Sequence, residues 1–178
     1  MKVIKRTFLN AAILFLASCA VAPSAIEMVP KIDKRTFTNS NKSLKIELTS
    51  GGEESEPFFA GSKIDNLSFT RALVQVLTNS NLFSKVATTG SADYVLSAVI
   101  FTQEQPVMGL NATVSLAVGY VLTDSVTGTQ VLNKYIAANY TAKFGDSLIG
   151  TTRVKKANEG AVRENLRLLI MELAQLRL

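Results

Sequence analysis

Cys19 is the single cysteine in this chain of 178 residues, and the residues before it are typical of a processing signal. A basic head is followed by an apolar run from Thr7 to Leu16 and then by small residues, which is the pattern of a secretory signal peptide. The apolar run is too short to cross a bilayer, which takes roughly 20 residues. One cysteine cannot form an internal disulfide, so in an export compartment Cys19 requires another explanation.

The four residues at the cleavage site resemble the lipobox of bacterial lipoprotein signal peptides: Leu16, Ala17, Ser18 and Cys19. The resemblance implies a signal peptide over residues 1–18 and cleavage before Cys19. It also implies a diacylglycerol on the Cys19 thiol and a third acyl chain on the new amino end. Such chains would anchor the protein stably, because each buried CH₂ adds about 0.8 kcal/mol of membrane affinity.

The residue after the lipobox cysteine bears on the destination of the protein. By resemblance to enteric lipoproteins, Ala20 in place of an aspartate indicates sorting to the outer membrane, on its periplasmic face. The alternative is an ordinary secreted protein whose signal peptide happens to end near a cysteine.

Histidine and tryptophan are absent from the whole sequence. Without histidine the chain lacks the commonest general acid/base, the Ser-His-Asp triad and the ligands of most zinc sites. Three of the 19 basic residues lie in the signal peptide, so the mature chain would carry 16 basic and 14 acidic residues, a net charge of +2. This balance does not support a nucleic-acid partner. We expect no enzyme, no metal site and no cofactor beyond the covalent lipid.

Two polar loops are candidate ligand-binding sites, but in both a purely structural role is favoured. The acidic run from Gly51 to Glu56 lacks the spacing of a calcium loop, which supplies six to eight oxygens at set positions, so a solvated loop is expected. The stretch from Asp124 to Thr129 is typical of a hairpin turn, in which Gly128 can adopt a positive φ.

Two further motifs near the last helix are weak. The sequence Gly145-Asp146-Ser147 is not a nucleophile elbow, because Ile149 stands where the final glycine belongs. A small basic cluster follows, and it either touches anionic headgroups or lipopolysaccharide phosphates or, as we favour, forms a solvated helix start: Arg153, Lys155 and Lys156.

Two features fit binding better than catalysis. One face of the segment 113–123, including Thr113 and Ser115, is rich in small residues and threonine, a surface that can accept another sheet, a lipid chain or a protein partner. Phe58 and Phe59 form an apolar pair in the acidic loop, suited to anchoring a partner. The alternative for both features is packing on the domain's own core.

Alternation of apolar and polar residues predicts four strands. The segment 44–49 has one apolar face, and 94–103 is apolar on both faces, so we expect the latter to be central and covered on both sides. The segments 113–123 and 130–144 are expected to form a hairpin with one face on the core.

Helical periodicity predicts two helices. Phe69, Leu73, Val76 and Leu77 recur along residues 68–79, and Asp65, Asn66 and Ser68 are candidate N-caps. The clearest stripe lies at the C-terminus: Val162, Leu166, Leu169, Ile170, Leu173 and Leu176. The predicted fold is α+β, an antiparallel sheet of about four strands with both helices on one face, in the order β-α-β-β-β-α.

The chain divides into three parts. Residues 1–18 form the signal peptide, residues 19–42 a lipidated tether broken up by proline, serine and asparagine, and residues 43–178 one α+β domain. The tether either lets the domain stand off the membrane or docks on a partner.

At the level of pattern, residues 44–176 resemble the transport auxiliary lipoproteins of ABC-type and mammalian-cell-entry-type lipid transporters. The likeness rests on the helix from Phe69 that ends in Ser80-Asn81-Leu82-Phe83, on Ala92-Asp93-Tyr94 at the entry to a long strand, and on Leu122 to Gly128 before the last strand and helix. The lipopolysaccharide-assembly lipoprotein has a related architecture. These motifs are structural, so the resemblance assigns no functional residue.

Three functions follow as hypotheses. The first is a non-enzymatic, lipid-anchored outer-membrane protein, an accessory or assembly subunit of an envelope transport or secretion complex. The second is a periplasmic carrier that shields an acyl chain of a lipid or glycolipid between helices and sheet. The third, least favoured, is a histidine-free envelope hydrolase using Asp146 or Ser147.

Overall fold

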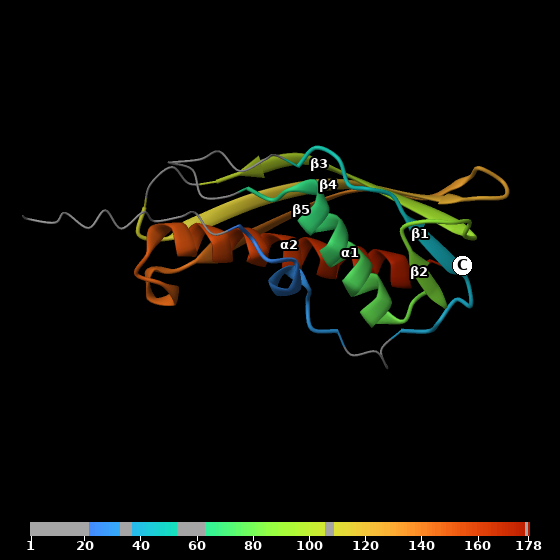
Figure 1. The fold of residues 1–178 in the computed structure, drawn as a ribbon, viewed down its shortest axis with the longest axis horizontal. Helices are drawn as coiled ribbons and strands as arrows, with labels where there is room; N and C mark the ends of the chain where they lie inside the picture. The colour runs from blue at the N-terminus through green and yellow to red at the C-terminus, as the bar shows by residue number, and fades with distance from the viewer. Residues whose placement is uncertain (1–21, 33–36, 53–62, 106–108, 177) are drawn as a thin grey trace, which may run out of the picture.

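The computed structural model describes residues 22–32, 37–52, 63–105, 109–176 and 178, in which two helices pack on one face of a five-stranded sheet (Figure 1). The strands are β1 (Ser43–Ile46), β2 (Lys85–Ala87), β3 (Tyr94–Glu104), β4 (Ala112–Asp124) and β5 (Gln130–Ala142). The helices are α1 (Asn66–Ser80) and α2 (Gly150–Ala174), and short 3₁₀ turns form η1 (Ala25–Met28) and η3 (Phe144–Asp146). The predicted α+β class and the placement of both helices on one face are confirmed.

The sheet has the order β2-β1-β3-β4-β5, and its pairing differs from the prediction. β3, β4 and β5 are antiparallel as expected, but β1 runs parallel to both of its neighbours. The prediction of four antiparallel strands is therefore wrong. The reason is α1, which connects β1 to β2 as a crossover and returns the chain in the same direction.

β1 is shorter than the predicted strand over residues 44–49. It ends at Ile46, and Leu48 is 66% exposed instead of lying on the apolar face. Beyond the strand the chain turns toward α1, where the backbone N–H of Thr49 donates to Oγ1 of Thr70 at 2.9 Å. At Thr49 a helix side chain thus satisfies the buried backbone group, and the next residue, Ser50, pairs with β3 again through a parallel bridge to Val99.

β3 is central in the sheet as predicted, but it is covered on one face only. Leu96, Ala98 and Ile100 are buried against the helices, whereas Val99 is 36% exposed and Phe101 is 64% exposed. The prediction that this strand is covered on both faces is wrong, because both helices lie on the same side of the sheet (Figure 1).

α1 follows the predicted pattern closely. The four residues of its stripe are fully buried, and the Asp65 side chain accepts a hydrogen bond from the backbone N–H of Ser68 at 2.8 Å. This is an N-cap, which satisfies one of the amide groups left free at a helix start. The helix ends where Asn81 adopts a left-handed conformation with φ of 57°.

α2 begins at Gly150, well before the predicted apolar stripe. In its first half it buries small and polar side chains such as Ala157, Asn158 and Ala161, so this part carries no strong apolar period. The predicted stripe is confirmed in the second half, where five of its members are at most 2% exposed: Val162, Leu166, Leu169, Ile170 and Leu173. Leu176 lies past the helix end and is half-buried.

Residues 22–32, assigned to the tether by their composition, pack against the domain. Met28 in η1 is fully buried in the core. The backbone N–H of Ser24 donates to Oε1 of Glu159 at 2.8 Å, and Arg163 donates to the backbone carbonyl of Glu27. This segment therefore holds the chain against α2 from Ser24 onward. In the part of the chain described here, neither helix is long and apolar enough to span a membrane.

Candidate binding surface

The face of the sheet opposite the helices forms the open face, defined by the outward residues of β3, β4 and β5. On β4 the inward residues are buried, while Thr113 is exposed and Ser115 is half-buried, as the alternation predicts. Thr113 and Thr141 of β5 are cross-strand partners whose hydroxyls lie 2.9 Å apart. The two residues predicted as a partner surface thus lie on the open face.

The three long strands place no charged side chain in the interior of the open face. The three long strands carry three charged residues, Glu104, Asp124 and Lys134. Glu104 and Asp124 are the last residues of their strands. Lys134 turns to the helix side, where its Nζ lies 3.1 Å from Oε2 of Glu172 in α2. A surface of this composition favours a partner that is itself uncharged where the two meet.

Two aromatic side chains, Phe101 and Tyr135, lie exposed on the open face. Phe101 lies at an irregularity in the β3–β4 register, and its ring covers Gly119, where an added Cβ would lie 2.5 Å from Cε2. The Phe101 and Tyr135 ring centroids are 5.9 Å apart, and Tyr135 is 61% exposed. Sequence reasoning missed both residues. The sequence did indicate that both residues alternate with the buried residues of their strands and so point to the opposite face of the sheet.

β5 forms a long edge of the sheet. The other edge is β2, which has three residues, whereas β5 has 13. An edge strand presents unpaired N–H and C=O groups that can pair with a strand of another chain. β5 therefore adds backbone hydrogen-bonding capacity alongside the open face.

Tyr120 heads a buried polar network on the helix side of the sheet. Its hydroxyl donates to Oδ1 of Asn165 at 2.6 Å, and the Asn165 amide donates to the carbonyl of Ile136 at 2.7 Å. Burial raises the pKa of the Tyr120 phenol well above its usual value, so the group stays neutral. The network joins β4, α2 and β5 and has no access to a substrate, which makes it structural.

A surface cleft of about 1170 Å³ lies between η1, α1, α2 and β5. Three of its charged residues make contacts within the chain: Arg163 donates to the Glu27 backbone carbonyl, and Arg167 makes a two-pronged pair with Glu164, at 2.7 and 2.9 Å. This pairing lowers the pKa of the Glu164 carboxyl, chiefly through the Arg167 hydrogen bond. Glu164 and Arg167 therefore neutralise each other in the wall of the cleft.

The residues considered for catalysis are occupied by their own backbone. The Asp146 carboxylate accepts from the backbone N–H of Lys143 at 2.7 Å, and Ser147 Oγ accepts from the N–H of Ile149 at 3.2 Å. Asp124 likewise caps the predicted hairpin turn, accepting from the N–H groups of Val126 and Thr127. Within the described ranges, no group of three or more metal-ligating side chains is placed to hold an ion.

The basic cluster lies in the first two turns of α2 and is only in part a solvated helix start, since Lys156 is exposed but Arg153 is buried. Arg153 is 7% exposed, and its guanidinium donates to the carbonyls of Ser147 and Gly109. Lys155 Nζ lies 2.9 Å from the Glu159 carboxylate, and Lys156 bonds the Asp146 carbonyl. The interpretation favoured from the sequence is therefore wrong for Arg153, a structural residue that joins the loop before β4 to the loop before α2.

Six predicted site residues lie outside the described part of the chain: Leu16, Ala17, Ser18, Cys19, Phe58 and Phe59. The acidic loop is described only at its first residues, Gly51 and Gly52. The lipidation and apolar-pair predictions therefore remain predictions.

Solved structures share this fold. A Xanthomonas campestris protein of the DUF330 family superposes with a TM-score of 0.62 at 14% identity, covering 87% of this chain and 92% of that one. A Helicobacter pylori protein described as a neuraminyllactose-binding hemagglutinin homologue gives 0.53 at 10% identity, covering 84% and 95%. The PelC dodecamer of Paraburkholderia phytofirmans gives 0.50 at 13% identity, covering 80% and 92%.

No family model matches the chain, and no curated protein matches it in sequence. At identities of 10 to 14% the structural likeness establishes the fold and nothing finer. It shows that this arrangement of two helices on one face of a sheet recurs in bacterial proteins. The function must then be argued from the surface of this chain.

Proposed function

We propose that this chain is a non-enzymatic, lipid-anchored protein of the bacterial outer membrane with its domain in the periplasm. Acyl chains on Cys19 hold one end, and the domain serves as an accessory or assembly subunit of an envelope transport or secretion complex. The lipobox resemblance supports the anchor, and the absence of histidine from the sequence supports a role without acid–base catalysis.

The open face carries the proposal. It exposes Phe101 and Tyr135 on long strands that place no charge in its interior, and the long strand β5 forms its edge. Exposed apolar and aromatic surface is unfavourable in water and marks interaction sites. We assign this surface to an envelope protein partner, with the ring of Tyr135 as an anchor.

The proposal is tested by site-specific crosslinking in native membranes. A photoreactive phenylalanine analogue placed at Tyr135 is expected to crosslink a stoichiometric envelope protein, identified by mass spectrometry. The matched control places the analogue at Thr78, which is exposed on α1, away from the sheet. Equal labelling from both positions, or labelling only of abundant bystander proteins, would refute the partner surface.

A lipid or glycolipid carrier is the second candidate, favoured by the cleft between η1 and α2. Against it, the layer between helices and sheet is filled by fully buried side chains such as Phe69, Leu116 and Leu166, so an acyl chain would have to lie in the surface cleft. Lipid extracted stoichiometrically from the purified protein, beyond the chains on Cys19, would favour the carrier.

A further inference from the structure

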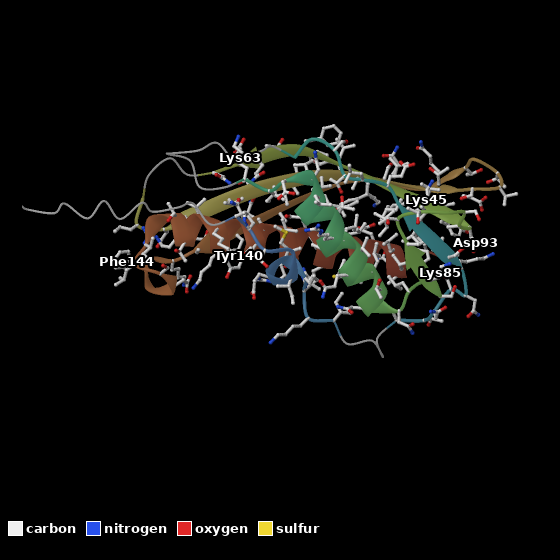
Figure 2. The ribbon with its side chains drawn as sticks, in the orientation of Figure 1. Lys45, Lys63, Lys85, Asp93, Tyr140 and Phe144 are labelled. Carbon is white, nitrogen blue, oxygen red and sulfur yellow. The ribbon has the colours of Figure 1, made fainter. Side chains whose placement is uncertain are left out.

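Four large apolar side chains are exposed at one end of the molecule and form what we term the apolar tip. Leu110 precedes β4, while Phe144, Leu148 and Ile149 lie between β5 and α2. Their exposed fractions are 72, 45, 78 and 60%, respectively. Ala112 at the start of β4 pairs with Ala142 at the end of β5. The loop before β4 and the loop after β5 therefore lie at the same end of the sheet. Phe144 is at the end of the molecule's long axis (Figure 2).

The apolar tip is held in place by polar contacts beneath it. Asn111 accepts a hydrogen bond from the backbone N–H of Phe144 at 3.1 Å, which joins the two loops. Arg153 donates to the Ser147 carbonyl at 2.7 Å and to the Gly109 carbonyl at 3.4 Å, and its guanidinium lies 5.3 Å from the centre of the Phe144 ring. A buried arginine therefore presents the apolar side chains on a fixed base.

Two exposed lysines, Lys143 and Lys156, lie beside the apolar tip. From Ala142 to Glu159 the sequence contains four basic residues, Lys143, Arg153, Lys155 and Lys156, and two acidic ones, Asp146 and Glu159. Glu104 adds a third acid at this end of the sheet. Lys143 and Lys156 are exposed, and Lys155 pairs with Glu159. Apolar side chains flanked by lysines fit the boundary between acyl chains and anionic headgroups.

The N-terminal segment runs toward the same end. Glu27 contacts Arg163, and Ser24, three residues earlier, contacts Glu159, which is one turn closer to the start of α2. Glu159 is nine residues into the helix, about 14 Å from Gly150 at a rise of 1.5 Å per residue. Ser24 is five positions after Cys19, a separation that spans at most about 18 Å. Cys19 is thus within reach of the level of the apolar tip.

We propose that the apolar tip inserts into the headgroup region of the bilayer that carries the Cys19 acyl chains. Lys143 and Lys156 face its anionic phosphates. The domain then stands on the membrane with its long axis upright, and the turn between β4 and β5 points away (Figure 1). The identity of the membrane rests on the proposed lipid anchor. The insertion itself is argued independently of the anchor, from the exposed apolar side chains and the two lysines.

The test uses tryptophan fluorescence, because the natural chain contains no tryptophan. Leu148→Trp places a single probe at the apolar tip, and Val126→Trp places the matched control on the opposite hairpin, at a residue that is 91% exposed. Both sites are exposed, so neither change disturbs the core. The full mature proteins are added to vesicles of phosphatidylethanolamine and phosphatidylglycerol that contain phospholipids with a doxyl quencher in their acyl chains.

We expect the emission of the Leu148→Trp protein to shift to shorter wavelength and to lose most of its intensity to the quencher, while that of Val126→Trp is unchanged. Adding Lys143→Glu and Lys156→Glu to the probe variant is expected to weaken the quenching. Vesicle-bound protein in which both probes are quenched equally, or not at all, overturns the proposal. So does an emission of Leu148→Trp that is already blue-shifted without vesicles, which would show that the apolar tip is buried against the chain itself or a second copy of it.

The mass of each purified protein shows whether it is acylated, so the membrane insertion of the apolar tip can be tested separately from the lipid anchor. Acylated protein that floats with vesicles while the Leu148 probe stays unquenched refutes the apolar tip and leaves the anchor standing. Unacylated protein whose Leu148 probe still inserts refutes the anchor and supports the apolar tip as a membrane contact in its own right.

Discussion

Gly160 lies in α2 directly against the ring of Tyr140 in β5. A Cβ at position 160 would stand 2.2 Å from Cδ1 of that ring, far inside contact distance. Glycine costs up to about 1 kcal/mol in a helix relative to alanine, but overpacking typically costs about 1–3 kcal/mol. We therefore expect Gly160→Ala to lower the free energy of unfolding by roughly 1 kcal/mol or more. Denaturant titration followed by circular dichroism measures this change.

The control for this prediction is Gly145→Ala, since an added Cβ at position 145 meets no atom within 4 Å. We expect that variant to have nearly wild-type stability. Combining Gly160→Ala with Tyr140→Ala should recover part of the loss caused by the clash. A Gly160→Ala protein more stable than the wild type would contradict the described packing of Tyr140.

Asp93 links the starts of β1 and β3. Its carboxylate accepts from the Ser43 hydroxyl at 2.6 Å and from the Ser43 backbone N–H at 2.7 Å, and these bonds hold the Asp93 pKa below its usual 3.8. A depressed folded-state pKa contributes stability above the unfolded pKa, and this contribution is lost as the pH falls through the folded pKa. We expect Asp93→Asn to reduce the decline of unfolding free energy between about pH 5 and pH 2.

The Asp93 prediction is measured by urea titration at several pH values. The carboxylate is exposed, so the effect is a change of slope and not a loss of the fold. Ser43→Ala should give a similar change by removing the donor. An unaltered pH dependence in both variants would show that the pair makes no contribution.

At the scale of elements, the C-terminal half of α2 forms much of the core. Leu169 is fully buried there, whereas Met171, two residues on, is 45% exposed. Leu169→Asp would place an unpaired charge among apolar side chains, which is strongly unfavourable. We expect a loss of roughly 4 kcal/mol or more, enough to unfold a marginally stable domain.

Met171→Asp is the matched control on the same helix. Its side chain contacts Arg167 at the surface, so a new carboxylate there has a basic neighbour. We expect its melting temperature to stay near that of the wild type. Equal melting temperatures for Leu169→Asp and the wild type would show that α2 does not pack as described.

The elements that could be predicted from the sequence are those in which apolar residues recur with a single helical or strand period. α1, the hairpin of β4 and β5, and the second half of α2 have such a period and were placed correctly. The first half of α2 was missed because it buries alanine and asparagine, which give no apolar stripe. The direction of β1 was missed because strand pairing depends on the path of α1, a tertiary property that alternation does not encode.

The candidate surface could be predicted only in part, for a related reason. The small polar residues of β4 indicated an open face, and Thr113 and Ser115 lie on it. Phe101 and Tyr135 are apolar, so a pattern-based interpretation assigns them to a core or overlooks them. Their exposure becomes visible only when both helices are placed on the opposite side of the sheet.

At the scale of the whole molecule, the contacts of residues 22–32 with α2 determine how the domain relates to a membrane. The chain has few residues between the first contact at Ser24 and the proposed anchor at Cys19. A domain on such a short connection cannot extend far from the bilayer. The open face and β5 run along the long axis of the molecule, so they remain accessible from the side when the apolar tip faces the membrane (Figure 1).

The anchor itself is tested by replacing its attachment atom. We expect the wild-type mature chain to begin at Cys19 and to carry three acyl chains, and Cys19→Ser to remain an unprocessed precursor without fatty acid, because a serine offers no thiol for diacylglycerol transfer. Metabolic labelling with an alkynyl fatty acid and mass spectrometry of the N-terminal peptide measure both features. Ser18→Ala is the control, since it keeps a small residue before the cysteine and should be processed normally. Fatty acid on Cys19→Ser, or a wild-type chain that starts at another residue, would remove the anchor and with it the proposed link to the membrane.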